Sequence, residues 1–165
     1  MEANMTDTSK PCKACGADVK LAVLDMFRGT EGPVTVSVNA MPARVCANGH
    51  KRFAYPEFVS QLMDFTADAA MATPQPAAVK RGLFKKHYHC SGCNTELPAA
   101  PTGQSERELE VRFEKAAPFK LMVQVDLHKC AQCGREQVLS NEVAGTSAFK
   151  AIAHGFHDAD VHVEG

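Results

Sequence analysis

Paired cysteines recur at a nearly constant spacing along this chain of 165 residues, and no other feature restricts its fold as much. Two copies of the same arrangement occur, each with a C-x2-C pair followed by a second pair of candidate metal ligands. The first pairs of the two copies lie 78 residues apart, and the second pairs begin 84 residues apart. The eight candidate ligands are Cys12, Cys15, Cys46, His50, Cys90, Cys93, Cys130 and Cys133. We therefore interpret the chain as two related units.

Each copy supplies four metal ligands from two tight turns. A C-x2-C turn directs two thiolates toward a common centre, and a second turn completes a tetrahedron that suits zinc. Four protein ligands leave no position for water or substrate, so two structural zinc ions per chain are predicted. Iron is the alternative at the site with four cysteines, because four thiolates also suit a rubredoxin-like centre.

The first site differs from the second in its last ligand. The second copy reads C-A-Q-C-G from Cys130, whereas the first reads C-A-N-G-H from Cys46, so Gly49 occupies the position of the fourth cysteine. We predict that His50 takes its place, because its longer side chain reaches further from one residue later. The alternative is a site of three cysteines that binds zinc weakly or not at all.

Composition favours metal sites over disulfides. The chain begins without an apolar signal peptide, and no stretch approaches the roughly 18 apolar residues that a membrane span needs. A cytoplasmic protein with no membrane partner is therefore expected, and in a reducing compartment paired cysteines serve as thiolate ligands. The seven cysteines would also leave one unpaired in any disulfide scheme.

Each copy contains a predicted hairpin between its two ligand pairs. Residues 19–27 and 34–40 flank a turn with two glycines and a proline, and residues 109–113 and 119–127 flank a break at 116–118. Apolar and polar side chains alternate along these runs, which predicts strands with one apolar face. The expected fold class is α+β, with tandem zinc ribbons, each an antiparallel hairpin pinned by a zinc and followed by a helix.

The helix after each ribbon is predicted from apolar periodicity. The first begins at Pro56, and its apolar stripe ends before Thr73. In the second, Ser140 or Asn141 caps a helix that stops at Gly155 and carries the apolar residues Val143, Phe149, Ile152 and Ala153. Each helix is expected to pack on its own ribbon. The predicted organisation is a first unit at 1–73, a proline-rich linker at 74–86 and a second unit at 87–165.

Two further clusters have alternative interpretations. Residues 80–89 are basic and aromatic, so Phe84 and Tyr88 either stack on nucleic-acid bases or pack on the second ribbon. The C-terminal cluster is either an additional metal site or a frayed polar tail. Its members are His154, His157, Asp158, Asp160 and His162.

The segment 36–46, V-S-V-N-A-M-P-A-R-V-C, follows a C-x2-C-G turn at Cys12 and resembles the YgiT-type zinc-finger family. In that family the domain is a zinc ribbon, often the toxin-contacting half of a bacterial antitoxin whose other half binds DNA. The resemblance covers the first third of the chain and implies a bacterial protein that binds zinc at Cys12, Cys15 and Cys46. Another ribbon stands where the antitoxins have their DNA-binding half, so neither toxin nor operator binding is carried over.

No catalytic motif accompanies the predicted metal sites, because the chain lacks a Gly-rich phosphate loop, a G-x-S-x-G elbow and an H-E-x-x-H helix. We therefore predict a protein that is not an enzyme, in which zinc holds two ribbons whose edges and loops contact a protein partner. The alternative is a nucleic-acid-binding protein that uses residues 80–89 with nearby basic residues, although the formal net charge of −1 gives no general attraction to a polyanion. Metal-dependent catalysis or metal transfer would need an exchangeable ligand, which only the His50 site and the C-terminal histidines offer. The basic residues near the cysteine turns are Lys10, Lys13, Lys129 and Arg135.

Overall fold

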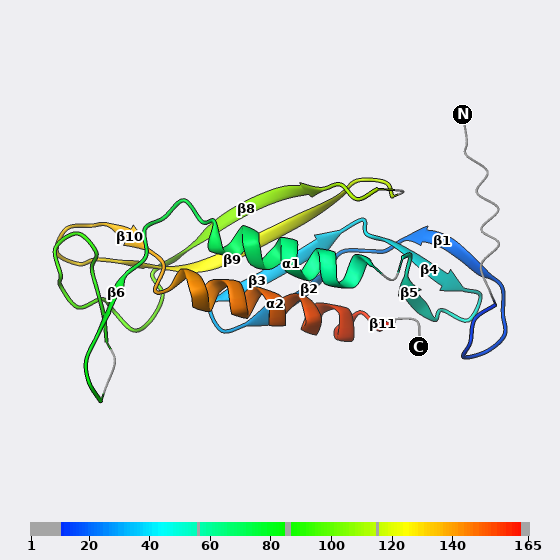
Figure 1. Ribbon diagram of the computed structural model, residues 1–165, viewed down its shortest axis with the longest axis horizontal. Helices are drawn as coiled ribbons and strands as arrows, with labels where there is room; N and C mark the ends of the chain where they lie inside the picture. The colour runs from blue at the N-terminus through cyan, green and yellow to red at the C-terminus, as the bar shows by residue number, and fades with distance from the viewer. Residues whose placement is uncertain (1–10, 56, 85–86, 115, 163–165) are drawn as a thin grey trace.

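The computed structural model describes residues 11–55, 57–84, 87–114 and 116–162, and it confirms the α+β class (Figure 1). Two helices lie across the middle of an elongated molecule whose ends are formed by strands and turns. In chain order the elements are β1 (Val19–Val23), β2 (Phe27–Glu31), β3 (Val34–Asn39), β4 (Pro42–Cys46), β5 (Lys51–Phe53), α1 (Phe58–Met71), β6 (Val79–Arg81), β7 (His87–His89), β8 (Gly103–Val111), β9 (Phe119–Lys129), β10 (Glu136–Gln137), α2 (Asn141–Asp158) and β11 (Val161–His162).

The central sheet contains strands from both halves of the chain. β3 pairs antiparallel with β9, from Val34 opposite Val125 to Asn39 opposite Lys120. β2 pairs with β3, β8 pairs with β9, and the short β10 lies beside the end of β9. Because β3 and β9 run in opposite directions, each leads toward a cysteine turn at the opposite end of the molecule (Figure 1).

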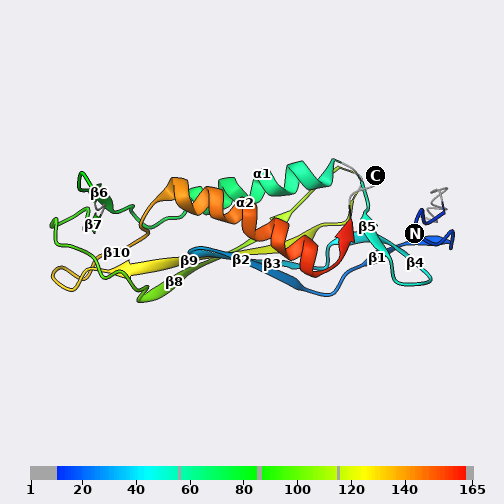
Figure 2. The same ribbon diagram turned by 90° about the horizontal axis from the view of Figure 1, so that it is seen from below.

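The predicted alternation accounts for how these strands face the core. In β9 the side chains at every second position from Phe119 to Leu127 are buried, and β3 buries Val34, Val36 and Val38 in the same way. Both helices cover this apolar face and lie side by side on it (Figure 2). The main core therefore lies between one sheet and two helices and uses residues of both predicted units.

Each helix packs on the hairpin of the other copy, so the expectation that each lies on its own ribbon is wrong. α2 packs on β2 and β3, whereas α1 packs on β9 and on α2. Phe58 of α1 has its ring 4.8 Å from that of Phe113, and Phe156 of α2 lies 5.8 Å from Phe27. The physical reason is that β3 and β9 join the two hairpins into one apolar face, which places each helix over the neighbouring hairpin.

The segment that follows each helix also pairs with the other half of the chain. β11 follows α2 and pairs in parallel with β5, so that Val161 lies opposite Lys51. Ala77 follows α1 and forms a parallel bridge with Val138, and the N–H of Ala78 donates to the Val138 carbonyl at 2.8 Å. Each half of the chain thus adds a helix and a short extended segment to the other half.

Small side chains allow α2 to approach the sheet closely. A Cβ atom built on Gly29 would lie 1.8 Å from the carbonyl oxygen of Ala151, so β2 and α2 touch through their backbones. The Ser140 side chain caps the helix as predicted, accepting from the N–H of Val143 at 3.2 Å. The helix continues past Gly155 to Asp158, so the predicted stop is wrong.

The predicted apolar stripe of α2 is also wrong in part. Val143 and Phe149 are each 42% exposed, and the buried face consists mainly of small residues. Larger side chains on that face would separate the helix from β2 and from α1, and Gly145 for example lies against Met71. The buried residues of α2 are Ala144, Gly145, Ser147, Ala148, Ala151, Ile152, Gly155 and Phe156.

The first hairpin bends where it leaves the central sheet. Its strands are interrupted between β1 and β2 and between β3 and β4, where Ala40 has a φ of 63° and the N–H of Leu24 donates to the Met41 carbonyl at 2.9 Å. Beyond the bend, β1, β4, β5 and β11 form a separate sheet of four strands, with β1 at one edge. No helix among the described residues has the length and apolarity needed to cross a membrane.

Candidate metal centres

The structure brings the eight predicted ligands together as two groups of four. In each group, the sulfur or nitrogen atoms that can bind a metal ion all lie within 4.8 Å of one another. The first group lies beside the sheet of β1, β4 and β5, and the second lies at the end of β9. Both groups can hold a metal ion, and the antiparallel pairing of β3 and β9 places them at opposite ends of the molecule.

The distances within each group match a tetrahedral site. A zinc ion with metal–sulfur bonds of about 2.3 Å separates its sulfur ligands by about 3.8 Å. The Sγ atoms of Cys90 and Cys133 are 3.5 Å apart, and those of Cys15 and Cys46 are 3.7 Å apart. Disulfide sulfurs would lie about 2 Å apart, and all seven cysteines are free.

Three of the four cysteine turns share one backbone conformation. Gly16, Asn94 and Gly134 directly follow the second cysteine of their turns and have φ values of 72°, 65° and 78°. Each donates its N–H to the carbonyl of the first cysteine, at 2.7 to 2.9 Å. This left-handed residue closes the turn so that both thiols face the same side, and glycine and asparagine are the residues that adopt it most readily.

The turn at Cys46 is one residue shorter. Gly49 has a φ of 84°, and its N–H donates to the Cys46 carbonyl at 3.0 Å. Gly49 therefore corresponds to the left-handed residue of the other turns, and it does not mark the position of a lost cysteine. His50 follows it, and its Nδ1 lies 3.2 Å from Cys46 Sγ and 3.6 Å from Cys12 Sγ.

Gln137 forms hydrogen bonds with the second group from the protein interior, a role that was not predicted from the sequence. Its fully buried side chain donates from Nε2 to Cys90 Sγ at 3.2 Å. Its Oε1 accepts from the backbone N–H of Ser91 at 2.9 Å, which ties it to the turn between Cys90 and Cys93. Such an outer contact orients a metal ligand. The sequence offers no distinct signal for it, because Gln137 directly follows the charged residues Arg135 and Glu136.

Hydrogen bonds favour the thiolate at three cysteines. At Cys93 the pKa is lowered chiefly by the Thr95 side chain. The hydrogen bond from Gln137, followed by backbone N–H donors, lowers the pKa of Cys90 to about 5. Contact with the Asn48 side chain is the largest of the hydrogen bonds that lower the pKa of Cys15 to about 6. Because a metal ion binds thiolates, these three positions are prepared for coordination.

Each group is buried on its inner side and open on its outer side. Cys12, Cys46, Cys90 and Cys130 are buried, whereas the second cysteine of every C-x2-C turn is exposed. With four protein ligands, neither group has a coordination position for a substrate. Groups of four protein ligands are typical of structural metal sites.

The other predicted clusters do not form a further group of this kind. His154 Nε2 lies 2.9 Å from a Glu31 carboxylate oxygen, and His162 Nε2 lies 2.6 Å from Asp160. In the part of the chain that the structure describes, only the two cysteine groups bring together three or more potential ligands. His154 and His162 thus each contact a single carboxylate.

Within the basic segment, β6 and β7 pair as a separate two-stranded hairpin. Phe84 is fully exposed, so the expectation that it packs on the second ribbon is wrong, whereas Tyr88 is half-buried against the second metal group. Lys10, Lys85 and Lys86 lie outside the described residues. The structure therefore leaves Phe84 available for contact with another molecule.

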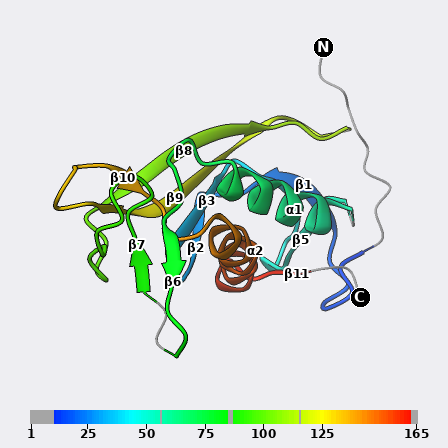
Figure 3. The same ribbon diagram turned by 60° about the vertical axis from the view of Figure 1, so that its left-hand side comes forward.

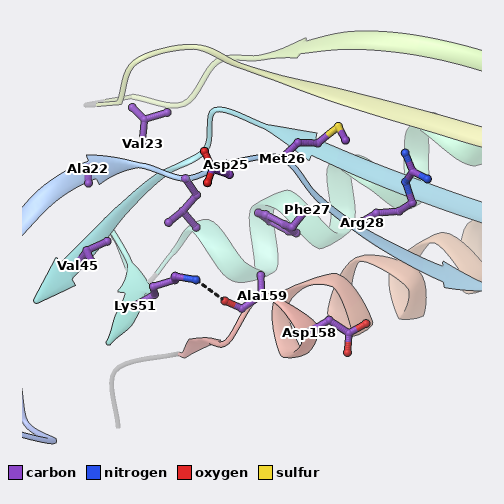
Figure 4. A pocket seen from close by; sticks show the side chains of 11 residues that line it. Ala22, Val23, Asp25, Met26, Phe27, Arg28, Val45, Lys51, Asp158 and Ala159 are labelled. Carbon is purple, nitrogen blue, oxygen red and sulfur yellow. Dashed lines mark hydrogen bonds between the residues drawn. The ribbon is translucent and has the colours of Figure 1, made fainter. Parts of the chain in front are cut away.

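A cavity beside the first metal group was not foreseen from the sequence. It has a volume of about 510 Å³ and lies between the bend of the first hairpin and the end of α2 (Figure 4). Lys51 crosses it and donates from Nζ to the Ala159 carbonyl at 3.2 Å. It exists because the first hairpin bends at this point, and the sequence gives no clear indication of that bend. The residues that line it are Ala22, Val23, Leu24, Asp25, Met26, Phe27, Arg28, Val45, Lys51, Asp158 and Ala159.

Comparison with known proteins identifies no similar protein from which a function could be inferred. No protein-family model, curated protein or solved structure matches it.

Proposed function

We propose that this chain is a non-enzymatic protein-interaction module built from two tandem zinc ribbons that have exchanged their helices. One zinc ion is bound by Cys12, Cys15, Cys46 and His50. The other is bound by the four cysteines of the second group. Each zinc holds one end of the shared fold, and the first end presents an edge strand to a protein partner.

The donor atoms support zinc at both ends. Three thiolates with one imidazole, and four thiolates, are ligand sets typical of structural zinc. The sulfur separations of 3.5 to 3.7 Å fit the tetrahedron that zinc prefers. The buried sides of both groups also exclude water from part of the site, which strengthens metal–thiolate bonding.

The observation that carries the interaction role is the exposed edge strand β1. It is the outer strand of its sheet in the described part of the chain, so one side of its backbone is free to pair with another strand. Leu21 and Val23 are 46% and 63% exposed on this strand, and Met26 in the following bend is 56% exposed. An extended segment of a partner can add to such an edge, with its main chain providing hydrogen bonds and its side chains contacting the apolar residues.

The adjacent cavity gives this edge a place for a partner side chain. Its lining is apolar at Val23, Leu24 and Phe27, and Val23 is shared with the exposed strand. Two positively and two negatively charged residues also line it. An apolar centre with charged residues around it is the usual anatomy of a protein interface. The charged residues are Asp25, Arg28, Lys51 and Asp158.

The intact protein is expected to bind two zinc ions per chain, measured by elemental analysis after gel filtration. His50→Ala removes one of the four ligands at the first site, so about one tightly held zinc should remain when a mild chelator is present. Replacing the neighbouring Lys51 with Arg is the matched control and should leave two. Retention of two tightly held zinc ions by His50→Ala would show that this site is completed in another way.

Loss of the apolar side chains on β1 should weaken partner binding at least about tenfold, because central apolar anchors dominate interface energies. We would place a photo-crosslinking residue at the exposed Lys20 of the intact protein, crosslink in cells, and identify the crosslinked peptide by mass spectrometry. A single extended segment of one protein is expected. Leu21→Ser with Val23→Ser should abolish that crosslink.

The matched control removes two similarly exposed apolar side chains from α2, through Val143→Ser with Phe149→Ser. This pair should leave the crosslink unchanged. If the β1 pair has no effect, or if both pairs reduce the crosslink equally, β1 is not the contact surface.

A further inference from the structure

A two-stranded hairpin projects from the end of the molecule that carries the second metal group (Figures 1 and 3). β6 and β7 pair antiparallel through three residue pairs, from Val79 opposite His89 to Arg81 opposite His87. We call the described residues of this hairpin, 79–84 and 87–89, the finger. The main core does not include any residue of its two strands, so the finger contributes nothing to that core.

The tip of the finger exposes two adjacent large apolar side chains. Leu83 is 93% exposed and Phe84 is 101% exposed, whereas the other exposed large apolar side chains of the described residues reach at most 63%. Gly82 precedes them with a φ of 118°, a conformation that only glycine adopts without strain. Nothing in the described part of the chain covers this pair.

Positive charge lies directly behind the apolar tip. Lys80 and Arg81 are exposed on β6, and His87 is exposed at the start of β7. His87 forms an ion pair with Glu96 at 2.8 Å, and Lys80 lies over the Tyr88 ring with its Nζ 5.7 Å from the ring centre. Since the whole chain has a net charge of −1, this charge is a local feature of the finger.

The base of the finger is fixed to the second metal group. Cys90 directly follows β7, and its N–H donates to the Thr95 carbonyl at 2.7 Å. The N–H of Leu97 also donates to the Tyr88 carbonyl of β7 at 2.9 Å, and on the β6 side the N–H of Ala78 donates to the Val138 carbonyl at 2.8 Å. Both strands of the finger thus leave the body from ordered positions, which keeps the tip at the far end of the molecule.

We propose that the finger binds the surface of membranes that contain anionic lipids, with Leu83 and Phe84 inserted among the acyl chains near the headgroups. Lys80 and Arg81 lie at the level of the phosphates and are attracted to them. Apolar burial and attraction between basic residues and anionic lipids act together in this kind of peripheral binding. That no helix of the described residues could cross a membrane does not bear on it, because the finger stays at the bilayer surface.

The shape of the tip favours a lipid surface over a nucleic acid. A protein that stacks on single-stranded bases offers aromatic rings within a basic groove, and Leu83 has no ring. Leu83 and Phe84 are 93% and 101% exposed, so among the described residues they project into solvent and do not line a groove. A bilayer accepts a projecting apolar tip without any complementary pocket.

Vesicle sedimentation with the intact zinc-bound protein tests the proposal. We expect binding to vesicles of equal parts phosphatidylcholine and phosphatidylglycerol, little binding to phosphatidylcholine alone, and weaker binding as salt is raised. Leu83→Ser with Phe84→Ser should reduce the partition coefficient at least about tenfold, because two apolar side chains no longer insert. Lys80→Ser with Arg81→Ser should reduce it about tenfold on anionic vesicles only.

Val143→Ser with Phe149→Ser is the control for loss of exposed apolar surface elsewhere, and it should bind like the unmodified protein. Zinc content and circular dichroism of each variant establish that the fold is intact, which the full exposure of the tip leads us to expect. No binding to anionic vesicles at low salt would overturn the proposal. So would equal binding by the tip variant, or tip-dependent binding of a single-stranded oligonucleotide at near-physiological salt without vesicle binding.

Discussion

Neither residues 1–73 nor residues 74–165 are expected to fold when they are expressed alone. In the intact chain β3 lies against β9, and α2 covers β2 and β3. The first fragment loses both partners, which uncovers Val34, Val36 and Val38, each at most 1% exposed in the intact fold. Burial of one aliphatic side chain contributes about 1.5–3 kcal/mol, so these three alone approach the total stability of a typical domain, roughly 5–15 kcal/mol.

The two fragments should combine when they are mixed in the presence of zinc. Circular dichroism and gel filtration are expected to show disordered or aggregated fragments that recover the spectrum and size of the intact chain as a one-to-one complex. The control is the intact protein with a protease site inserted at Pro74, which is exposed between α1 and β6. Cleavage there should leave the complex folded, because the contacts between the halves are not covalent.

A symmetric pairing of one fragment with itself would also agree with the structure. β3 and β9 are equivalent strands of the two copies and already pair antiparallel with each other. A folded monomer of residues 1–73 with a cooperative thermal transition would contradict the prediction that neither fragment folds alone. That result would instead support the division into two independent units that the sequence predicts.

The metal ligands were predictable because their arrangement is local. A turn of five residues, closed by Gly16, Asn94 or Gly134, brings two thiols together without help from the rest of the fold. The alternation from 119 to 127 likewise identified β9, because the period of two follows from strand geometry alone. The cap at Ser140 depends only on the N–H of the residue three positions later.

The exchange between the halves was not predictable from these patterns. Alternation shows which face of a strand is apolar, but it does not show which strand lies beside it, and the pairing of β3 with β9 is such a choice. Gly29 illustrates the limit. The sequence pattern places it in the turn of the first hairpin, yet it lies within β2, where a Cβ would be 1.8 Å from the Ala151 carbonyl oxygen. Only the exchanged position of α2 creates this contact.

Gly49 shows the same limit on a smaller scale. Aligned by counting residues, it replaces a cysteine, whereas the backbone places it where the other turns have Gly16 or Gly134. The turn is one residue shorter, and this places the side chain of the next residue, His50, beside the three sulfurs. Counting along the sequence identified the residue that lies beside the sulfurs, but the reason for its position is the length of the turn.

Removal of zinc from the second group is expected to unfold that end of the molecule and leave the centre intact. The second end has a small cluster of its own, in which the buried residues are Cys90, Leu97 and Cys130. Two of these three are metal ligands, so without the ion little apolar contact is left to hold the turns. The main core contains no cysteine and is held by the sheet and both helices.

Cys130→Ser tests this separation most directly, because it removes a buried ligand and leaves the first group unchanged. By hydrogen exchange, the turn amides of Asn94 and Gly134 should lose about a thousandfold in protection, because local opening no longer has to release the metal. The amides of β3 and β9 should keep most of their protection from hydrogen exchange, and one zinc ion per chain should remain bound. Ala131→Ser, a change at the neighbouring exposed position, is the control and should behave like the unmodified protein.

Two outcomes would contradict the account of the metal as a support for the ends. If the turn amides of Cys130→Ser stay protected, the second end is held by contacts other than the metal, such as the hydrogen bonds of Gln137 to Ser91. If β3 and β9 lose protection together with the turns, the ends and the centre form one cooperative unit. We expect the turns alone to lose protection. The two metal groups lie at opposite ends of the central sheet, and the core of that sheet joins the halves of the chain without them.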